Sequence, residues 1–121
     1  MKQNVYTIYV RTGDDPDGGT DGTIFIQLFG TTGQTENIFL PARDIFSFET
    51  NGTDKFVLQV PDVGELTRCC LRLESGTGDP VRWQVKDVRI EDDETDRTWS
   101  FGFNRWLNSD DPAAATACAA G

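Results

Sequence analysis

The sequence predicts an all-β fold, and specifically a β-sandwich. Apolar and polar residues alternate in short runs, so that every second side chain of an extended chain faces the same side. Clusters of Gly, Asp, Asn and Pro separate these runs, as expected for turns. No stretch carries an apolar stripe at helical spacing. This pattern of short strands, in a chain of 121 residues, predicts two packed sheets within one domain.

The predicted strands follow one another along the chain. Each run is rich in β-branched or aromatic residues and ends at a turn cluster. The runs cover residues 5–11, 23–29, 37–40, 56–60, 68–73, 81–90 and 98–103. Trp83, Trp99 and Trp106 lie on or beside the last two runs, and we expect all three to be mostly buried in the core.

The C-terminal segment has a different composition. Residues 109–121 include an Ala-rich stretch that has no apolar stripe to bury. We therefore expect the sandwich to occupy residues 1–108, and residues 109–121 to form a disordered tail or linker.

The charge of the chain narrows the class of partner. The chain has 20 acidic and 11 basic residues, a net charge of −9, which argues against nucleic-acid binding because phosphate contacts need clustered Lys and Arg. No long apolar stretch is present, so the sequence predicts neither a signal peptide nor a transmembrane segment. These features predict a cytoplasmic or peripheral membrane protein.

The cysteines predict little chemistry. Cys69 and Cys70 are adjacent on a predicted strand and therefore point to opposite faces, and Cys118 lies in the Ala-rich segment. An odd number without CxxC spacing predicts no zinc site and no disulfide framework, and favours a reducing compartment. The alternation places Cys69 on the inner face and Cys70 outside, between Arg68 and Arg72. There Cys70 is either a reactive thiol or, as we favour, a bystander.

The loop at residues 13–23, GDDPDGGTDGT, is the strongest candidate for function. Its four carboxylates, Asp14, Asp15, Asp17 and Asp21, are interleaved with glycines that let the backbone bend. Calcium takes roughly six to eight oxygen ligands from carboxylates and carbonyls on such loops. Asp and Gly are also common in solvated turns, so both interpretations stay open on the loop alone.

The residue types argue against catalysis. The chain has no histidine, which excludes Ser-His-Asp and Cys-His nucleophilic systems and histidine-ligated metal chemistry. Carboxylates on an exposed loop have neither a raised pKa nor a pocket for substrate. We therefore predict neither an enzyme nor a small-molecule substrate.

Six ordered blocks resemble the PLAT domain, which is named for polycystin, lipoxygenase and alpha-toxin. The resemblance extends from about Val5 to Leu107, and its opening blocks are similar to stand-alone plant members, which usually carry a signal peptide and more cysteines. The blocks are YTIYVRTG (6–13), GGTDGTIFIQLFG (18–30), NGTDKF (51–56), DVGEL (62–66), SGTGDPVRWQVKDVRI (75–90) and WSFGFNRWL (99–107). The resemblance implies an antiparallel β-sandwich of two four-stranded sheets, with functional loops at one end.

The resemblance also implies calcium ligands. One family site corresponds to the carboxylates of Asp17 and Asp79 and the carbonyls of Gly19 and Pro80. A second family site combines the position of Thr20 with acids of the loop 41–54, where three residues are candidates: Asp44, Glu49 and Asn51. Two further residues, Asp21 and Asp54, match acidic family positions, although each is also suited to hydrogen bonding with turn backbone.

The expected function is calcium-dependent association with an anionic membrane surface. Ile45 and Phe46 are the candidates for insertion and Arg43 for headgroup contact, unless the two apolar residues pack inward at the start of a strand. The alternative is a protein-interaction or assembly module in which calcium only orders the loops.

Overall fold

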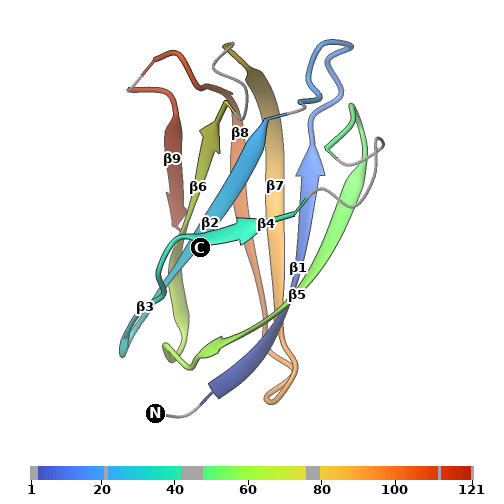
Figure 1. Cartoon of the computed structure of the whole chain (residues 1–121). Coiled ribbons are helices and arrows are strands. Elements are labelled where there is room, and N and C mark those ends of the chain that lie inside the picture. Colours follow the sequence, from blue (N-terminus) through green and yellow to red (C-terminus); the bar gives the residue numbers. More distant parts are fainter. Residues whose placement is uncertain (1–2, 21, 42–47, 76–79, 112, 121) are drawn as a thin grey trace.

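The computed structural model describes residues 3–20, 22–41, 48–75, 80–111 and 113–120, and these form two antiparallel sheets packed face to face (Figure 1). One sheet has the strand order β5-β1-β7-β8, and the other has the order β3-β2-β6-β9, with β4 pairing beside β2. The strands are β1 (Gln3–Thr12), β2 (Thr23–Gly30), β3 (Gly33–Gln34), β4 (Ile38–Leu40), β5 (Thr53–Pro61), β6 (Leu66–Glu74), β7 (Arg82–Asp92), β8 (Thr98–Asn108) and β9 (Thr116–Ala120).

The predicted all-β sandwich is confirmed, and the predicted strand runs coincide closely with β1, β2 and β4–β8. The sheets have four and five strands rather than four each, because β3, β4 and β9 all belong to the second sheet. No helix long and apolar enough to cross a membrane occurs among the described residues.

Strand β9 corrects the expectation of a disordered tail. Residues 116–120 pair antiparallel with β6, and the N–H of Leu73 donates to the carbonyl of Ala115 at 2.8 Å. The segment escaped prediction because Ala and Thr give almost no apolar alternation, and because its pairing partner lies far away in the sequence.

A disulfide between Cys70 and Cys118 corrects the expectation for the cysteines. The two residues are directly opposed on β6 and β9, with their Cα atoms 4.0 Å apart. Cys70 is therefore not a free thiol, and the bridge is typical of oxidising compartments rather than the reducing one expected. Cys69 points inward as predicted and is fully buried, which raises the pKa of its thiol and keeps it unreactive.

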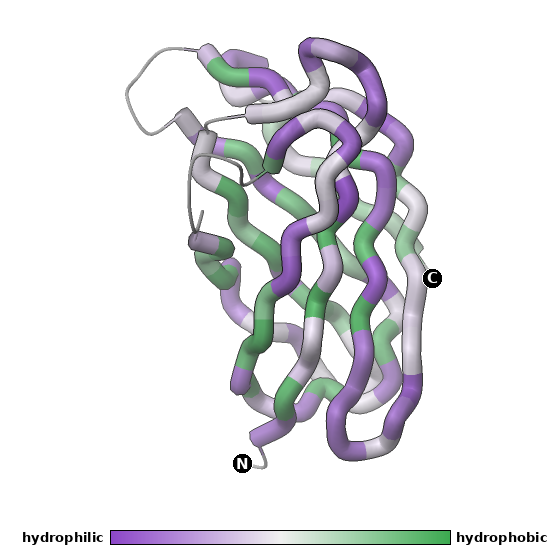
Figure 2. The backbone as a smooth tube through the Cα atoms, turned by 90° about the vertical axis from the view of Figure 1, so that its right-hand side faces the viewer, coloured by the Kyte–Doolittle hydropathy of each residue, from purple (hydrophilic) through white to green (hydrophobic). Residues whose placement is uncertain are grey.

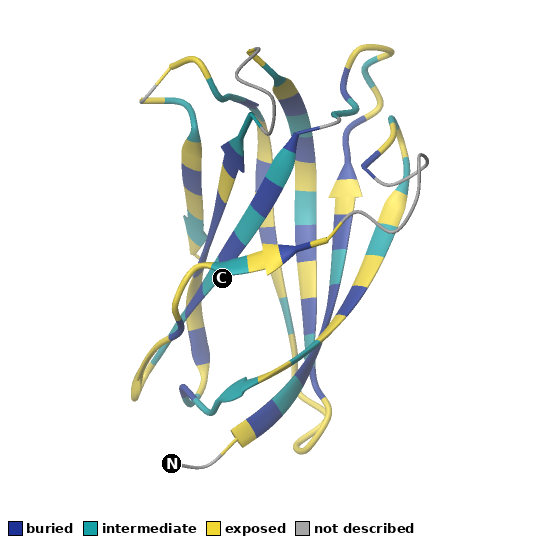
Figure 3. Ribbon diagram, viewed as in Figure 1, coloured by how far each residue is buried: buried dark blue, intermediate teal, exposed yellow. Residues whose placement is uncertain are grey.

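The core lies between the sheets and follows the alternation of the sequence, visible along the strands in Figures 2 and 3. Trp83 is at its centre, fully buried, and its indole N–H donates to the hydroxyl of Thr12 at 2.9 Å. Trp99 and Trp106 are only half-buried, so the expectation that all three tryptophans are mostly buried holds for Trp83 alone.

The loops of the sandwich gather at its two ends. Residues 13–20 and Gly22 between β1 and β2, residues 48–52 before β5, and Pro80 and Val81 before β7 lie at the same end (Figure 1). This end therefore brings together segments that are more than sixty residues apart in sequence, as the predicted site requires.

Candidate functional site

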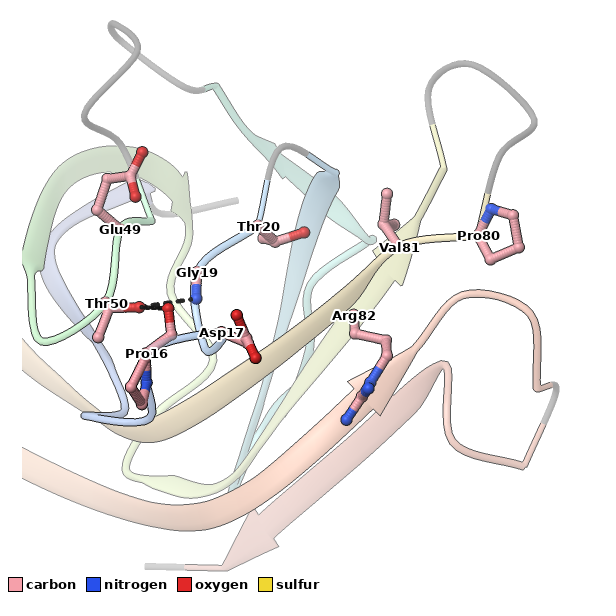
Figure 4. A pocket seen from close by; sticks show the side chains of 9 residues that line it. All are labelled: Pro16, Asp17, Gly19, Thr20, Glu49, Thr50, Pro80, Val81 and Arg82. Atoms are coloured by element: carbon pink, nitrogen blue, oxygen red, sulfur yellow. Dashed lines mark hydrogen bonds between the residues drawn. The ribbon is translucent and has the colours of Figure 1, made fainter.

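Three loops enclose an open hollow of about 520 Å³ at this end of the sandwich (Figure 4). We call it the loop hollow. Its lining residues are Pro16, Asp17, Gly19, Thr20, Glu49, Thr50, Pro80, Val81 and Arg82. The exposed carboxylate of Asp17 points toward the side of the hollow on which Arg82 lies, whereas the carboxylate of Glu49 points away from Asp17.

Backbone hydrogen bonds to Gln84 of strand β7 hold the acidic loop in place. The N–H of Gly13 donates to the Gln84 carbonyl at 2.8 Å, and the Gln84 N–H donates to the Gly18 carbonyl at 2.9 Å. The Gln84 side-chain oxygen also accepts from the N–H of Asp15 at 3.0 Å. The loop is therefore attached to the first sheet at both of its sides, which limits how far its like charges can move apart.

Thr50 connects the acidic loop to the loop before β5. Its hydroxyl accepts from the N–H of Gly19 at 3.2 Å and donates to the carbonyl of Asp15 at 3.0 Å. The backbones approach so closely here that a Cβ at position 19 would lie 3.0 Å from the carbonyl oxygen of Phe48. Glycine at position 19 therefore lets the two loops pack against each other.

Phe48 joins the second loop to the core. Its buried ring lies 5.8 Å from the ring of Phe56 and 5.6 Å from the ring of Trp83, measured between centroids. Its backbone has a φ of 57°, an unusual left-handed conformation for a bulky residue. Its carbonyl accepts from the N–H of Thr20 at 3.0 Å, and its N–H donates to the carboxylate of Asp54 at 2.8 Å. Such local strain in a well-supported loop is common at functional sites.

Five of the predicted ligand residues line the loop hollow together: Asp17, Gly19, Thr20, Glu49 and Pro80. The hydroxyl of Thr20 accepts from the N–H of Gly22 at 3.1 Å, so it also shapes its own loop.

The other predicted residues divide into two groups. The carboxylate of Asp54 accepts a hydrogen bond from the backbone N–H of Phe48, which is the alternative role considered for this residue. The N–H of Asn51 donates to the carbonyl of Gly13 at 2.8 Å. Neither residue lines the hollow. The remaining predicted residues lie outside the described part of the chain: Asp21, Arg43, Asp44, Ile45, Phe46 and Asp79.

Arg82 and Thr50 are the site residues that sequence reasoning missed. The guanidinium of Arg82 lies 4.5 Å from the centre of the Trp106 ring, on the outer side of the first sheet. The alternation of strand 81–90 gave the signal, because it assigns Arg82 to the face opposite Trp83. For Thr50 no pattern in the sequence indicates a bond to a glycine across the loops.

The atoms around the loop hollow that could coordinate a metal ion are oxygens. Carboxylates of Asp17 and Glu49, the hydroxyl of Thr20 and the neighbouring backbone carbonyls are the ligand types that calcium prefers. The set fits calcium chemically, but it is incomplete: no group of three or more His, Cys, Asp or Glu positioned to hold a metal occurs within the described ranges.

Comparison with known proteins identifies the family. The PLAT/LH2 domain model matches residues 6–116. The chain belongs to the PLAT/LH2 domain family. A PLAT domain is a non-catalytic module. The match includes the first residue of β9, so the family model extends beyond the predicted boundary at residue 108.

Three relatives illustrate the relationship. Human lipoxygenase homology domain-containing protein 1 is 35% identical over 109 residues, which span 89% of this PLAT chain and 5% of that protein. The crystal structure of coral 8R-lipoxygenase, described as calcium-activated through a C2-like domain, matches with a TM-score of 0.79 and 28% identity over 97% of this chain and 17% of that one. A calcium-dependent 11R-lipoxygenase matches with a TM-score of 0.74 and 27% identity, again over 97% and 17%. The PLAT chain thus corresponds to a small part of each relative.

Proposed function

We propose that this PLAT domain associates with anionic membranes in a calcium-dependent way, through the loop hollow and residues 41–47, which directly precede Phe48 in the sequence. The observation that carries the proposal is the convergence of Asp17, Gly19, Thr20, Glu49 and Pro80 on one hollow. The described calcium activation of the coral 8R-lipoxygenase through a C2-like domain supports the same assignment.

In the proposed site Asp17 and Asp79 provide the charged ligands, with the carbonyls of Gly19 and Pro80. Two carboxylates brought to one end of a sandwich repel each other unless a cation lies between them. Thr20, with Asp44 or Glu49, would provide a second group of oxygens. An open site of this kind should bind calcium weakly, with a Kd on the order of 10⁻⁵ to 10⁻³ M.

Arg82 adds a cation at the edge of the same hollow. A guanidinium offers paired N–H donors that match the oxygens of a phosphate. We therefore propose that a lipid phosphate contacts the bound calcium on one side and Arg82 on the other. Arg43, Ile45 and Phe46 would then meet the headgroup and acyl boundary.

Calorimetric titration with calcium, with and without vesicles of phosphatidylserine and phosphatidylcholine, tests the proposal. We expect calcium binding in solution, and co-sedimentation with vesicles that needs calcium and decreases with salt. Phe46→Ser should reduce co-sedimentation without loss of folding. Val57→Ser is the control, because Val57 is an exposed apolar residue on the outer face of the first sheet and does not line the loop hollow. Absence of vesicle binding at millimolar calcium would overturn the membrane proposal.

The second candidate is a protein-interaction module in which calcium only orders the loops. The bonds that Thr50 makes across two loops favour it, because calcium bound there would stiffen both loops at once. Calcium binding without any vesicle binding would support this candidate over the first.

A further inference from the structure

The outer face of the second sheet carries an aromatic surface at a distance from the loop hollow. Three phenylalanines, Phe25, Phe29 and Phe39, lie on it together with Arg68 and Arg72 of strand β6. We call these five residues the aromatic–arginine face. Phe39 is 52% exposed, and Phe25 and Phe29 are half-buried.

The strand register arranges this face as parallel rows. In one row Phe39 pairs with Phe25, and Phe25 pairs with Arg72. In the other row Phe29 pairs with Arg68. Between these two rows, on the same face, lie the Cys70–Cys118 disulfide and Gln27, which pairs with Cys70.

Contacts between these side chains make the face a preformed surface. The rings of Phe25 and Phe39 are 5.8 Å apart between centroids, and the guanidinium of Arg68 lies 4.1 Å from the centre of the Phe29 ring. A stacked guanidinium keeps its N–H donors free at the edges while its plane covers the ring. Exposed aromatics with stacked arginines are typical of the energetically dominant residues in protein interfaces.

The charge of this face is opposite to that of the chain. The chain has a net charge of −9, yet on this side of β6 two arginines, Arg68 and Arg72, stand against one carboxylate, that of Glu74. Glu74 lies at its margin and pairs with Arg72, whereas Arg68 has no ion-pair partner among the residues that the structure describes. On the outer face of the other sheet Arg11 pairs with Asp87 and Arg89 pairs with Glu91, so these two arginines are neutralised as Arg72 is, and Arg68 differs from all three.

We propose that the aromatic–arginine face binds an acidic polypeptide segment of a partner protein, with carboxylates on Arg68 and Arg72 and aliphatic side chains on the phenylalanines. A narrow segment contacts only this face and so avoids the acids elsewhere on the domain. An anionic bilayer is the weaker candidate, because it would face the whole side of a molecule whose net charge repels it.

The test uses the peptide acetyl-Glu-Glu-Leu-Glu-Glu-Leu-Glu-Glu-amide, titrated into isotope-labelled protein in the presence of EDTA and followed by amide NMR shifts. We expect the shifts to concentrate on β2, β6 and β9. Binding should weaken by roughly tenfold or more for the double variant Arg68→Glu, Arg72→Glu, and also for Phe39→Ser. Arg89→Glu on the other sheet is the control for charge and should bind as the parent does. Thermal melting of each variant confirms that it is folded.

Three results would overturn the proposal: peptide shifts on other strands, unchanged affinity in the Arg68 and Arg72 variant, or equal binding of a Lys-Lys-Leu peptide of the same pattern. Binding to phosphatidylserine vesicles in EDTA tests whether the face binds a membrane. If the protein binds these vesicles but not the peptide, the ligand of the face is lipid and the proposal is wrong. Sedimentation equilibrium without peptide tests whether the protein associates with itself. If the parent dimerises and the Arg68→Glu, Arg72→Glu variant does not, the face binds a second copy of the chain and the proposal is wrong. Because EDTA removes calcium, failure here is distinct from failure of the loop hollow.

Discussion

The hydroxyl of Thr50 accepts a hydrogen bond from the N–H of Gly19, across 31 positions of sequence. The same hydroxyl donates to the carbonyl of Asp15, so one side chain satisfies two backbone groups of the acidic loop. This side chain fixes the position of the loop that carries Asp17.

Replacing Thr50 by valine should lower the free energy of unfolding by about 1–2 kcal/mol, because both backbone groups lose a partner while the side-chain volume is kept. Calcium affinity should fall as well, since the loop hollow loses the bond that joins its two loops. Denaturant unfolding and calorimetric titration measure the two effects. Thr50→Ser retains the hydroxyl and should behave much more like the parent.

Asp17→Asn should weaken calcium binding strongly and remove the calcium-dependent rise in Tm that a bound ligand produces. Asp14→Asn removes the same charge from the same loop, but Asp14 does not line the loop hollow. We therefore expect Asp14→Asn to keep most of the calcium response. Equal responses in the two variants would mean that only the summed charge of the loop matters.

Cys118→Ser should destabilise the domain by roughly 2–4 kcal/mol, because the disulfide closes a long loop and holds β9 to the sheet. Reductant should lower the Tm of the parent and leave that of Cys118→Ser unchanged. Hydrogen exchange of the amides in β9 should become fast in the variant, since Ala and Thr side chains bury little surface to hold this strand. Retained protection in β9 would show that its backbone pairing is sufficient.

Thr12→Val should cost about 1–3 kcal/mol in unfolding free energy, because it leaves the indole N–H of fully buried Trp83 without its partner. Thr12→Ser keeps the acceptor and should cost less. Urea unfolding monitored by tryptophan fluorescence compares the two. A loss in Thr12→Ser as large as that in Thr12→Val would show that the methyl group of Thr12, which only Thr12→Ser removes, contributes as much to stability as the hydrogen bond to Trp83.

Asp92 should make the domain sensitive to acid. Burial by itself raises the pKa of its carboxyl, but hydrogen bonds from the Asn4 side chain and the N–H groups of Glu94 and Thr95 outweigh burial and lower the pKa. A lowered folded-state pKa means that the stabilisation is present above the unfolded pKa and is lost as pH falls through the folded value. Stability measured between about pH 2 and pH 6 should therefore fall less steeply for Asp92→Asn than for the parent. Asp110→Asn, at an exposed turn, is the control.

Much of the fold follows from local sequence. The alternation in β1, β2 and β6 marks both the strands and their buried faces, and the inward position of Cys69 was predicted from it correctly. The acidic composition of residues 13–23 likewise identified the loop that lines the hollow. These features are local because a period of two is a property of neighbouring residues in an extended chain.

Tertiary structure decided what depends on distant residues with small or polar side chains. Strand β9 carries too little apolar area for a periodic signal, and it becomes a strand only by pairing with β6, where Cys118 meets Cys70. The bond from Gly19 to Thr50 and the stacking of Arg82 on Trp106 likewise join separate segments. Composition and periodicity indicate the secondary structure that each segment favours by itself. These contacts, in contrast, exist only after the two sheets have packed and brought their loops to one end.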